Sequence, residues 1–212
     1  MDDMGFSLEI PCELENLRLP SNELLNFYYL KKNRIFYIDY EIDISILEIQ
    51  REIMLINMED INIPVEKRIP IKILLDCPGG LLSETMSLIA SIKMSKTPIY
   101  TINMADAYSG GAMILMAGHK RYAMPYSKAM IHTGSSGLGG TYEQVESQSR
   151  KYKKEVETMG KFIMDNTKID SKLYKKNKAI DWYMDENEQV QYGLVDEIID
   201  DLYGLLFEEM NG

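Results

Sequence analysis

The stretch IPIKILLDCPGGLLSETMSLIASIKM, residues 69–94, decides the fold. Ile69–Leu75 is a nearly continuous apolar run, which is typical of a strand covered on both faces. Cys77-Pro78-Gly79-Gly80 ends that run, and a helix is predicted from about Leu82 to Met94. A buried strand followed by a turn and a helix is the building unit of α/β domains.

The same order of strand and helix recurs on both sides of this stretch. Upstream, apolar residues three and four apart predict an amphipathic helix over Ile46–Ile56, after a strand rich in β-branched and aromatic residues. That strand is Arg34–Tyr40. Further strands are predicted at Pro98–Asn103, Tyr122–Ala123 and Lys128–Ile131, with a helix at Ser109–Ala117 and a loop or hairpin at Gly134–Gly140. The repetition predicts an α/β fold with a largely parallel sheet.

The two ends of this pattern are less regular. Residues 1 to about 30 contain Pro11 and Pro20, which interrupt any long element, and are predicted to form an N-terminal extension or loop. Thr141–Asn166 instead carries a narrow apolar stripe with steps of three and four, the pattern of a long helix that packs along a seam. This helix either lies along its own domain or forms an oligomer contact.

Composition excludes several classes of protein. A chain of 212 residues with 45% apolar and 26% charged residues is expected to form one globular domain. Its net charge of −10, without a dense Lys/Arg stripe, argues against nucleic-acid binding. The first residues lack the features of a signal peptide, and no run is long enough to span a bilayer, so a cytoplasmic protein without membrane contact is expected. Two cysteines without CxxC spacing and two histidines favour neither a disulfide nor a metal site.

Ser109 is the candidate nucleophile. It lies in Ala107-Tyr108-Ser109-Gly110-Gly111, between a strand and an apolar helix, where a sharp turn can expose a serine beside free backbone N–H groups. Serine is also a common helix cap, so the motif alone leaves a structural role open. The turn at Asp76–Gly80 similarly fits either a backbone that faces a ligand or a simple strand-to-helix connection.

Two further residues complete a candidate triad. His132 ends a predicted strand and is favoured as the base over His119, which lies beside Lys120 and Arg121 in a predicted surface turn. Asp181 precedes an apolar segment, where a carboxylate needs a partner such as a histidine N–H. Each residue by itself also fits an ordinary structural role.

Four segments in order resemble the ClpP family: LLDCPGG at 74–80, AYSGGA at 107–112, AMPYSKAMIH at 123–132 and DWYMDENEQVQYGLVDEI at 181–198. The likeness runs from about Asn33 to Asp201. It implies a ClpP/crotonase-like fold with repeated β-β-α units, in which Thr141–Asn166 is a protruding handle helix. The implied division is an N-terminal extension or axial region at 1–32, a protease domain at 33–203 and a C-terminal tail at 204–212.

The resemblance also implies a self-compartmentalising serine endopeptidase that acts on unfolded proteins. Ser109, His132 and Asp181 would form the catalytic triad, and the N–H groups of Gly80 and Gly110 the oxyanion hole. Substrate binding is expected at Gly79, Thr133 and Gly134. No metal or cofactor is expected, and ATP would be used only by a partner unfoldase of the ClpX or ClpA type. Seven-membered rings that stack into a tetradecamer are the implied assembly.

This chain departs from the family pattern at several positions. Gly110 replaces the usual methionine, which alters the pocket for the residue preceding the scissile bond, and Thr133-Gly134 replaces Gln-Pro. Ile180 replaces an arginine that pairs between rings, and residues before Asn33 lack the axial-loop sequence, as in a specialised or phage-borne member. The alternatives are a catalytically silent ring subunit, an acyl-CoA enzyme on the same fold, and a Ser–Lys dyad using Lys120 or Lys128.

Overall fold

The computed structural model describes residues 21–207, and the chain divides into two compact units, residues 1–33 and 34–212. Cys12 and the first 20 residues of the predicted N-terminal extension lie outside the described residues. In the first unit, α1 (Asn22–Lys32) begins where the Ser21 side chain accepts a hydrogen bond from the N–H of Leu24 at 3.2 Å. Of the two alternatives predicted for residues 1 to about 30, an extension or a loop, the loop is wrong from Asn22 onward, because the cap at Ser21 starts a helix after Pro20. The N-terminal extension stays a prediction.

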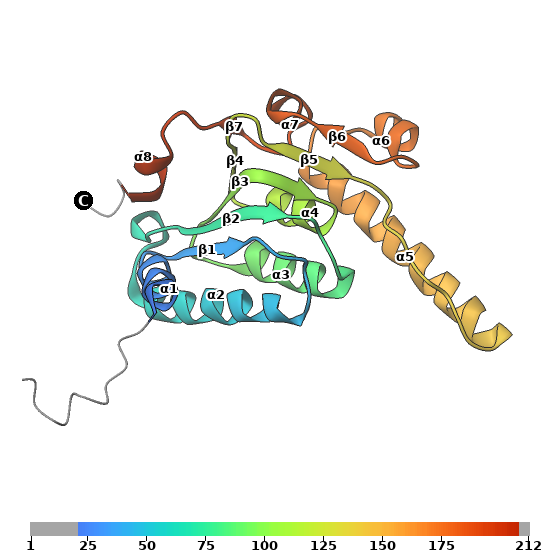
Figure 1. The fold of residues 1–212 in the computed structure, drawn as a ribbon, viewed down its shortest axis with the longest axis horizontal. Helices are drawn as coiled ribbons and strands as arrows, with labels where there is room; N and C mark the ends of the chain where they lie inside the picture. The colour runs from blue at the N-terminus through green and yellow to red at the C-terminus, as the bar shows by residue number, and fades with distance from the viewer. Residues whose placement is uncertain (1–20, 208–212) are drawn as a thin grey trace, which may run out of the picture. The chain divides into compact units, whose positions relative to one another are not determined.

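The second unit alternates strands and helices (Figure 1). Its strands are β1 (Ile35–Ile38), β2 (Ile71–Cys77), β3 (Ile99–Tyr108), β4 (Lys120–Ala123), β5 (Lys128–Ile131), β6 (Trp182–Met184) and β7 (Glu197–Ile198). Its α-helices are α2 (Leu47–Glu59), α3 (Leu82–Met94), α4 (Gly110–Ala117), α5 (Tyr142–Asn166), α6 (Ser171–Asn177), α7 (Glu186–Tyr192) and α8 (Leu202–Phe207). Three short 3₁₀ turns follow β1 and α2: η1 (Ile44–Ile46), η2 (Asp60–Asn62) and η3 (Val65–Lys67).

The strands form one sheet in the order β1-β2-β3-β4-β7, in which all neighbours are parallel. The predicted α/β fold with a largely parallel sheet is confirmed, and the architecture is that of the ClpP/crotonase-like fold. β2 is buried along almost its whole length, as its apolar run predicted. Each parallel connection needs a crossover, and α2, α3 and α4 supply the crossovers between β1 and β4.

β3 is longer than predicted and divides the sheet. Its first half, Tyr100–Asn103, pairs with β4, whereas Asp106–Tyr108 pairs with β5. At the division the buried Asn103 amide donates to the carbonyl of Lys128 and to Oε1 of Gln189, both at 2.9 Å. Gln189 lies on α7 and donates in turn to the carbonyl of Ser127 at 3.1 Å. These polar contacts hold α7 beside the start of β5, which pairs with β3 outside the β1-β2-β3-β4-β7 order.

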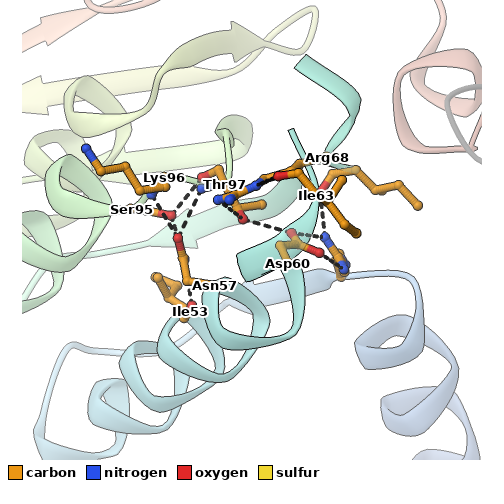
Figure 2. A network of polar contacts seen from close by, with 10 residues as sticks. Ile53, Asn57, Asp60, Ile63, Arg68, Ser95, Lys96 and Thr97 are labelled. Atoms are coloured by element: carbon orange, nitrogen blue, oxygen red, sulfur yellow. Dashed lines mark hydrogen bonds and ion pairs between the residues drawn. The ribbon is translucent and has the colours of Figure 1, made fainter. Parts of the chain in front are cut away.

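The core of this unit lies between the sheet and its helices. α2 contacts α3, α3 contacts α4, and α4 contacts β2, β3 and β5, with every residue of α4 buried. A polar network closes one end of this layer (Figure 2), where Asn57 Oδ1 accepts the N–H groups of Lys96 and Thr97 at 2.8 and 3.1 Å. Asp60 accepts the Thr97 hydroxyl at 2.8 Å and two bonds from Arg34 at 2.7 and 2.8 Å. The end of α2 is thereby fixed to the loop that enters β3.

The long helix α5 is confirmed, and it begins at a capping box formed by Thr141 and Gln144. Met159, Gly160 and Ile163 near its C-terminal end are buried in its own domain, whereas Tyr142 at its start is exposed. Figure 1 shows its N-terminal half extending beyond the sheet. The stripe thus packs along its own domain near one end, and the oligomer contact stays a prediction.

The remaining predictions concern the C-terminal part. Asp185 caps α7 and shares a capping box with Glu188, as the sequence predicted for Glu186–Tyr192. The division at 33–203 and 204–212 stays a prediction, although α8 runs across residue 203 and its Leu206 is buried. Within residues 21–207, no helix is both long and apolar enough to cross a membrane.

Candidate active site

Strand register brings Ser109, His132 and Asp181 together. β3 and β5 are parallel with Tyr108 beside Met130, so Ser109 and His132 leave the sheet at the same edge. β5 and β6 are antiparallel with Ile131 opposite Trp182, so the next pair in that register is His132 and Asp181. Three residues far apart in the chain therefore meet because each lies one position beyond a paired strand end.

The His132 ring lies between the side chains of Ser109 and Asp181. His132 Nε2 lies 2.8 Å from Ser109 Oγ, and His132 Nδ1 lies 3.4 Å from Asp181 Oδ1. The second distance is longer than an ordinary charge-assisted hydrogen bond. The Asp181 side chain is 57% exposed, and that of His132 is 25% exposed. A neutral imidazole protonated at Nδ1 would donate to Asp181 and accept the Ser109 proton.

The backbone at Ser109 has the conformation of a sharp strand-to-helix turn. Its φ of 53° is uncommon for a residue with a side chain and costs about 1–3 kcal/mol. Two hydrogen bonds hold it: the Ser109 N–H donates to the Met130 carbonyl at 2.8 Å, and the Ser109 carbonyl accepts from Met113 at 3.1 Å. The Ser109 hydroxyl does not cap α4, so it is directed to His132 instead.

Gly79 is the residue that leaves room for this turn. Its φ is +100°, and a Cβ placed on it would lie 2.7 Å from Ser109 Cβ and 2.9 Å from the Tyr108 carbonyl. No side chain fits at that position without moving Ser109. Gly79 does not line the cleft beside Ser109, so its visible role is to support the serine from behind.

Gly80 and Gly110, whose N–H groups are expected to bind an oxyanion, both line the cleft beside Ser109. Ile42 forms a bridge with this turn through the Gly79 carbonyl at 2.6 Å and the Leu81 N–H at 2.8 Å, which leaves the Gly80 N–H outside the bridge. Gly110 is the first residue of α4, where backbone N–H groups have no partner within the helix. The helix N-terminus adds partial positive charge at the same place.

A cleft of about 420 Å³ opens beside these groups. Ser109, His132, Gly80 and Gly110 line it, together with Thr133 and Gly134, the residues expected to bind substrate. Asp181 lies behind His132 and does not face the cleft. Within residues 21–207, no cluster of histidine, cysteine or acidic side chains has a metal-binding arrangement.

Sequence reasoning missed the apolar wall of the cleft. Met113, Met130 and Met159 line it beside Ser109, along with Thr85 and Tyr152. Met113 lies four residues after Ser109 on α4, and that spacing alone could have identified it. Thr85 carries no such signal, because it arrives from α3 through tertiary packing.

Thr85 also gives a physical reason for Gly110. A Cβ on Gly110 would lie 2.6 Å from Thr85 Oγ1 and 3.0 Å from Ile42 Cδ1. The buried Thr85 hydroxyl donates to the Leu81 carbonyl at 2.8 Å, so it is held in place. In this chain, the space that a longer residue after the serine would need is therefore filled from the neighbouring helix.

The alternative bases are placed elsewhere. His119 is separated from Ser109 by α4, which is about 12 Å long at 1.5 Å per residue. Burial and the charge of Lys93 lower the pKa of His119, and its Nδ1 accepts the Ile99 N–H at 3.0 Å. Lys120 Nζ lies over the Tyr100 ring, 5.0 Å from its centre. Neither Lys120 nor Lys128 lines the cleft.

Two other acidic groups near the turn are held protonated. Burial raises the pKa of the Cys77 thiol to about 11, which makes it a poor nucleophile. Burial and a hydrogen bond to Asp106 raise the pKa of Tyr108 to about 12. Neither residue lines the cleft, whereas the Ser109 hydroxyl lines it and lies 2.8 Å from His132 Nε2.

Comparison with known proteins shows the family of this chain. The family model described as Clp protease matches residues 23–201, which is most of the chain. The chain belongs to the Clp protease family. The match includes Ser109, His132 and Asp181 within its limits, and it extends the resemblance seen in the sequence into residues 23–32.

Curated members of the Clp protease family are about a third identical to this chain over the stretches that align. The "ATP-dependent Clp protease proteolytic subunit" of Deinococcus radiodurans is 32% identical over 132 residues, covering 61% of this chain and 65% of the relative. Subunit 2 of Treponema denticola is 33% identical over 131 residues, covering 61% and 66%. Subunit 2 of Corynebacterium efficiens is 29% identical over 176 residues, covering 82% and 85%. The chain thus spans just under two thirds of the length of the first two relatives.

Proposed function

We propose that this chain is a serine endopeptidase that hydrolyses peptide bonds of unfolded proteins, with Ser109, His132 and Asp181 as its catalytic triad. The observation that carries the proposal is the 2.8 Å contact between Ser109 Oγ and His132 Nε2 beside the N–H groups of Gly80 and Gly110. The relatives are named as proteolytic subunits of ATP-dependent Clp proteases, which supports the same activity.

The proposed reaction begins with attack by Ser109 Oγ on the scissile carbonyl while His132 Nε2 takes the serine proton. Asp181 orients the imidazole and stabilises the imidazolium that forms. The tetrahedral oxyanion accepts hydrogen bonds from Gly80 and Gly110, and one such donor typically contributes about 10²–10³ in turnover. His132 then protonates the leaving amine, and water, deprotonated by His132, releases the acyl group from Ser109.

The cleft suits an extended peptide. Its walls are the Gly80 turn on one side and the irregular segment after His132 on the other. Neither wall belongs to a complete sheet at this point, so backbone groups of a peptide strand can pair with them. We propose that the methionine side chains beside Ser109 receive an apolar residue, since methionine adapts to side chains of different shape.

Assembly and partners are part of the proposal. We propose that copies of this chain form seven-membered rings that stack face to face through the exposed half of α5. An ATP-using unfoldase of the ClpX or ClpA type would supply unfolded substrate, and the chain itself would use no cofactor. Ile180 is 59% exposed next to Asp181, so this position offers an apolar contact to a neighbouring ring rather than an ion pair.

Ser109→Ala tests the function directly. We expect hydrolysis of a fluorogenic peptide to fall by about 10⁴-fold or more, because the triad acts as a unit. A fluorophosphonate probe should label the wild type at Ser109 and fail to label Ser109→Ala or His132→Ala. Ser171→Ala is the matched control, since Ser171 is exposed and does not line the cleft.

Turnover that survives in Ser109→Ala contradicts the assignment of the nucleophile. A wild type that assembles but shows neither turnover nor labelling favours a silent ring subunit instead. Sedimentation of all variants shows whether assembly is unchanged.

A further inference from the structure

The segment of residues 133–140 joins His132 to the cap of α5 and forms one wall of the cleft. Thr133, Gly134, Ser135 and Ser136 all line the cleft. The segment is rich in glycine and serine and has no helix or strand. A segment of this composition has high conformational entropy, so a fixed shape requires contacts from outside it.

Two side chains of α5 supply those contacts. The Tyr152 hydroxyl donates to the Thr133 carbonyl at 3.3 Å. The Gln148 amide donates to the Gly139 carbonyl at 2.9 Å and accepts the Gly139 N–H at 3.2 Å. Among residues 21–207, the backbone of 133–140 shows no hydrogen bond to other backbone groups, so these three bonds are its backbone attachments.

The geometry makes α5 a rigid support for the wall. Gln148 and Tyr152 are four residues apart and therefore share one face of the helix. They hold the segment near both of its ends, at Thr133 and at Gly139. α5 is itself anchored in the domain core through Met159 and Ile163, about two and three turns beyond Tyr152.

We propose that Tyr152 and Gln148 are positioning residues for substrate: they hold the segment after His132 against α5 and so keep the peptide-binding wall in place. The inference rests on the proposed peptidase function. It assigns these two side chains a role in binding an extended peptide and not in the bond-breaking step.

The two roles separate because His132 is placed by other contacts. β5 and β6 pair up to Ile131 and Trp182, and Ser109 is bonded to the Met130 carbonyl. Loss of the α5 contacts therefore leaves Ser109 and His132 in register while the wall beyond Thr133 becomes mobile. A substrate that needs the wall should bind less well, whereas a small reagent that needs only Ser109 should react as before.

The experiment uses Tyr152→Phe, Gln148→Ala and the double variant of the full chain. For a peptide of eight or more residues, we expect KM to rise about two- to tenfold for each single variant and further for the double variant, with kcat within about twofold. The labelling rate of Ser109 by a small fluorophosphonate should stay at the wild-type value. Tyr126→Phe makes the same chemical change at an exposed position outside α5 and the cleft, and should leave KM unchanged.

Three results overturn the inference. KM unchanged in the double variant means that the wall does not need α5. A parallel fall in kcat and in labelling rate means that the two residues support the triad and not the substrate. A wild type that neither hydrolyses the peptide nor reacts with the probe refutes the proposed function and this inference together, whereas the first two results leave the proposed function standing.

Discussion

Gly79→Ala tests whether the site depends on the close approach of two turns. The added Cβ would lie 2.7 Å from Ser109 Cβ, whereas an ordinary contact needs about 3.4 Å. Ser109 or the Gly79–Gly80 turn must therefore move by about 0.7 Å. Movement of the serine breaks its 2.8 Å contact with His132, and movement of the turn displaces the Gly80 N–H.

The expected losses follow from this displacement. A misplacement approaching 1 Å typically costs about 10²-fold, so we expect kcat to fall by about that factor. Alanine at a positive φ costs about 1–2 kcal/mol and the steric conflict about 1–3 kcal/mol. A gain of about 0.4–1 kcal/mol from the less flexible unfolded chain offsets part of this cost. A glycine-to-alanine control shares this gain, so relative to that control the free energy of unfolding should decrease by the full cost of about 2–5 kcal/mol.

Gly137→Ala is that control, because a Cβ at Gly137 meets no atom within 4 Å. Both variants change the unfolded chain alike, so the difference between their urea unfolding curves reports the strain in the folded state. Peptide hydrolysis and probe labelling of Ser109 measure the catalytic effect. If Gly79→Ala matches Gly137→Ala in stability and matches the wild type in kcat, the close contact does not constrain Ser109 and the reasoning is wrong.

Two further predictions concern stability. Burial raises the pKa of Asp60, but hydrogen bonds from Arg34 and Thr97 and the charge of Arg34 outweigh burial, so the folded pKa lies below the unfolded value. The stabilisation by Asp60 is therefore present above the unfolded pKa of about 3.9 and is lost as the pH falls through the lower folded pKa. Asp60→Asn should lower the free energy of unfolding at pH 7 by about 3 kcal/mol and make the stability of the protein less dependent on pH below about pH 5. Urea unfolding across pH measures both effects. An unchanged pH dependence of stability would contradict the role of the ion pair. Ile163 is 1% exposed and anchors α5, so Ile163→Ala should lower the free energy of unfolding by about 2–5 kcal/mol. Lys161→Ala, on the exposed face of the same helix, should lower it by less than about 0.5 kcal/mol. Equal effects of the two variants in thermal unfolding would argue against the anchor.

Much of the local structure was predictable from patterns within short stretches. The buried strand β2 and the helix α3 follow from an apolar run, a glycine turn and helical spacing, which are properties of neighbouring residues. The cap at Asp185 and the long helix α5 follow in the same way. Helix α1 was missed because its weakly amphipathic sequence buries no residue, so no apolar face identified it.

The site was predictable in part. Ser109, His132 and Asp181 were selected by motif and resemblance, and the structure brings them together. The apolar wall was not predicted, because Thr85 and Met159 reach the cleft from α3 and α5 only after those helices pack. The attachment of residues 133–140 to Tyr152 and Gln148 gives no signal in sequence spacing, since a glycine-rich loop can lie against many surfaces.

The sequence by itself determined the types of element, the position of the sharp turn at Ser109 and the family of the chain, since these depend on the order of residues along short segments. Tertiary structure decided that β3 pairs with both β4 and β5, and that β5 pairs antiparallel with β6. That choice of strand partners sets the 2.8 Å and 3.4 Å contacts of His132, because a hydrogen bond depends on positions in space that residue order does not specify.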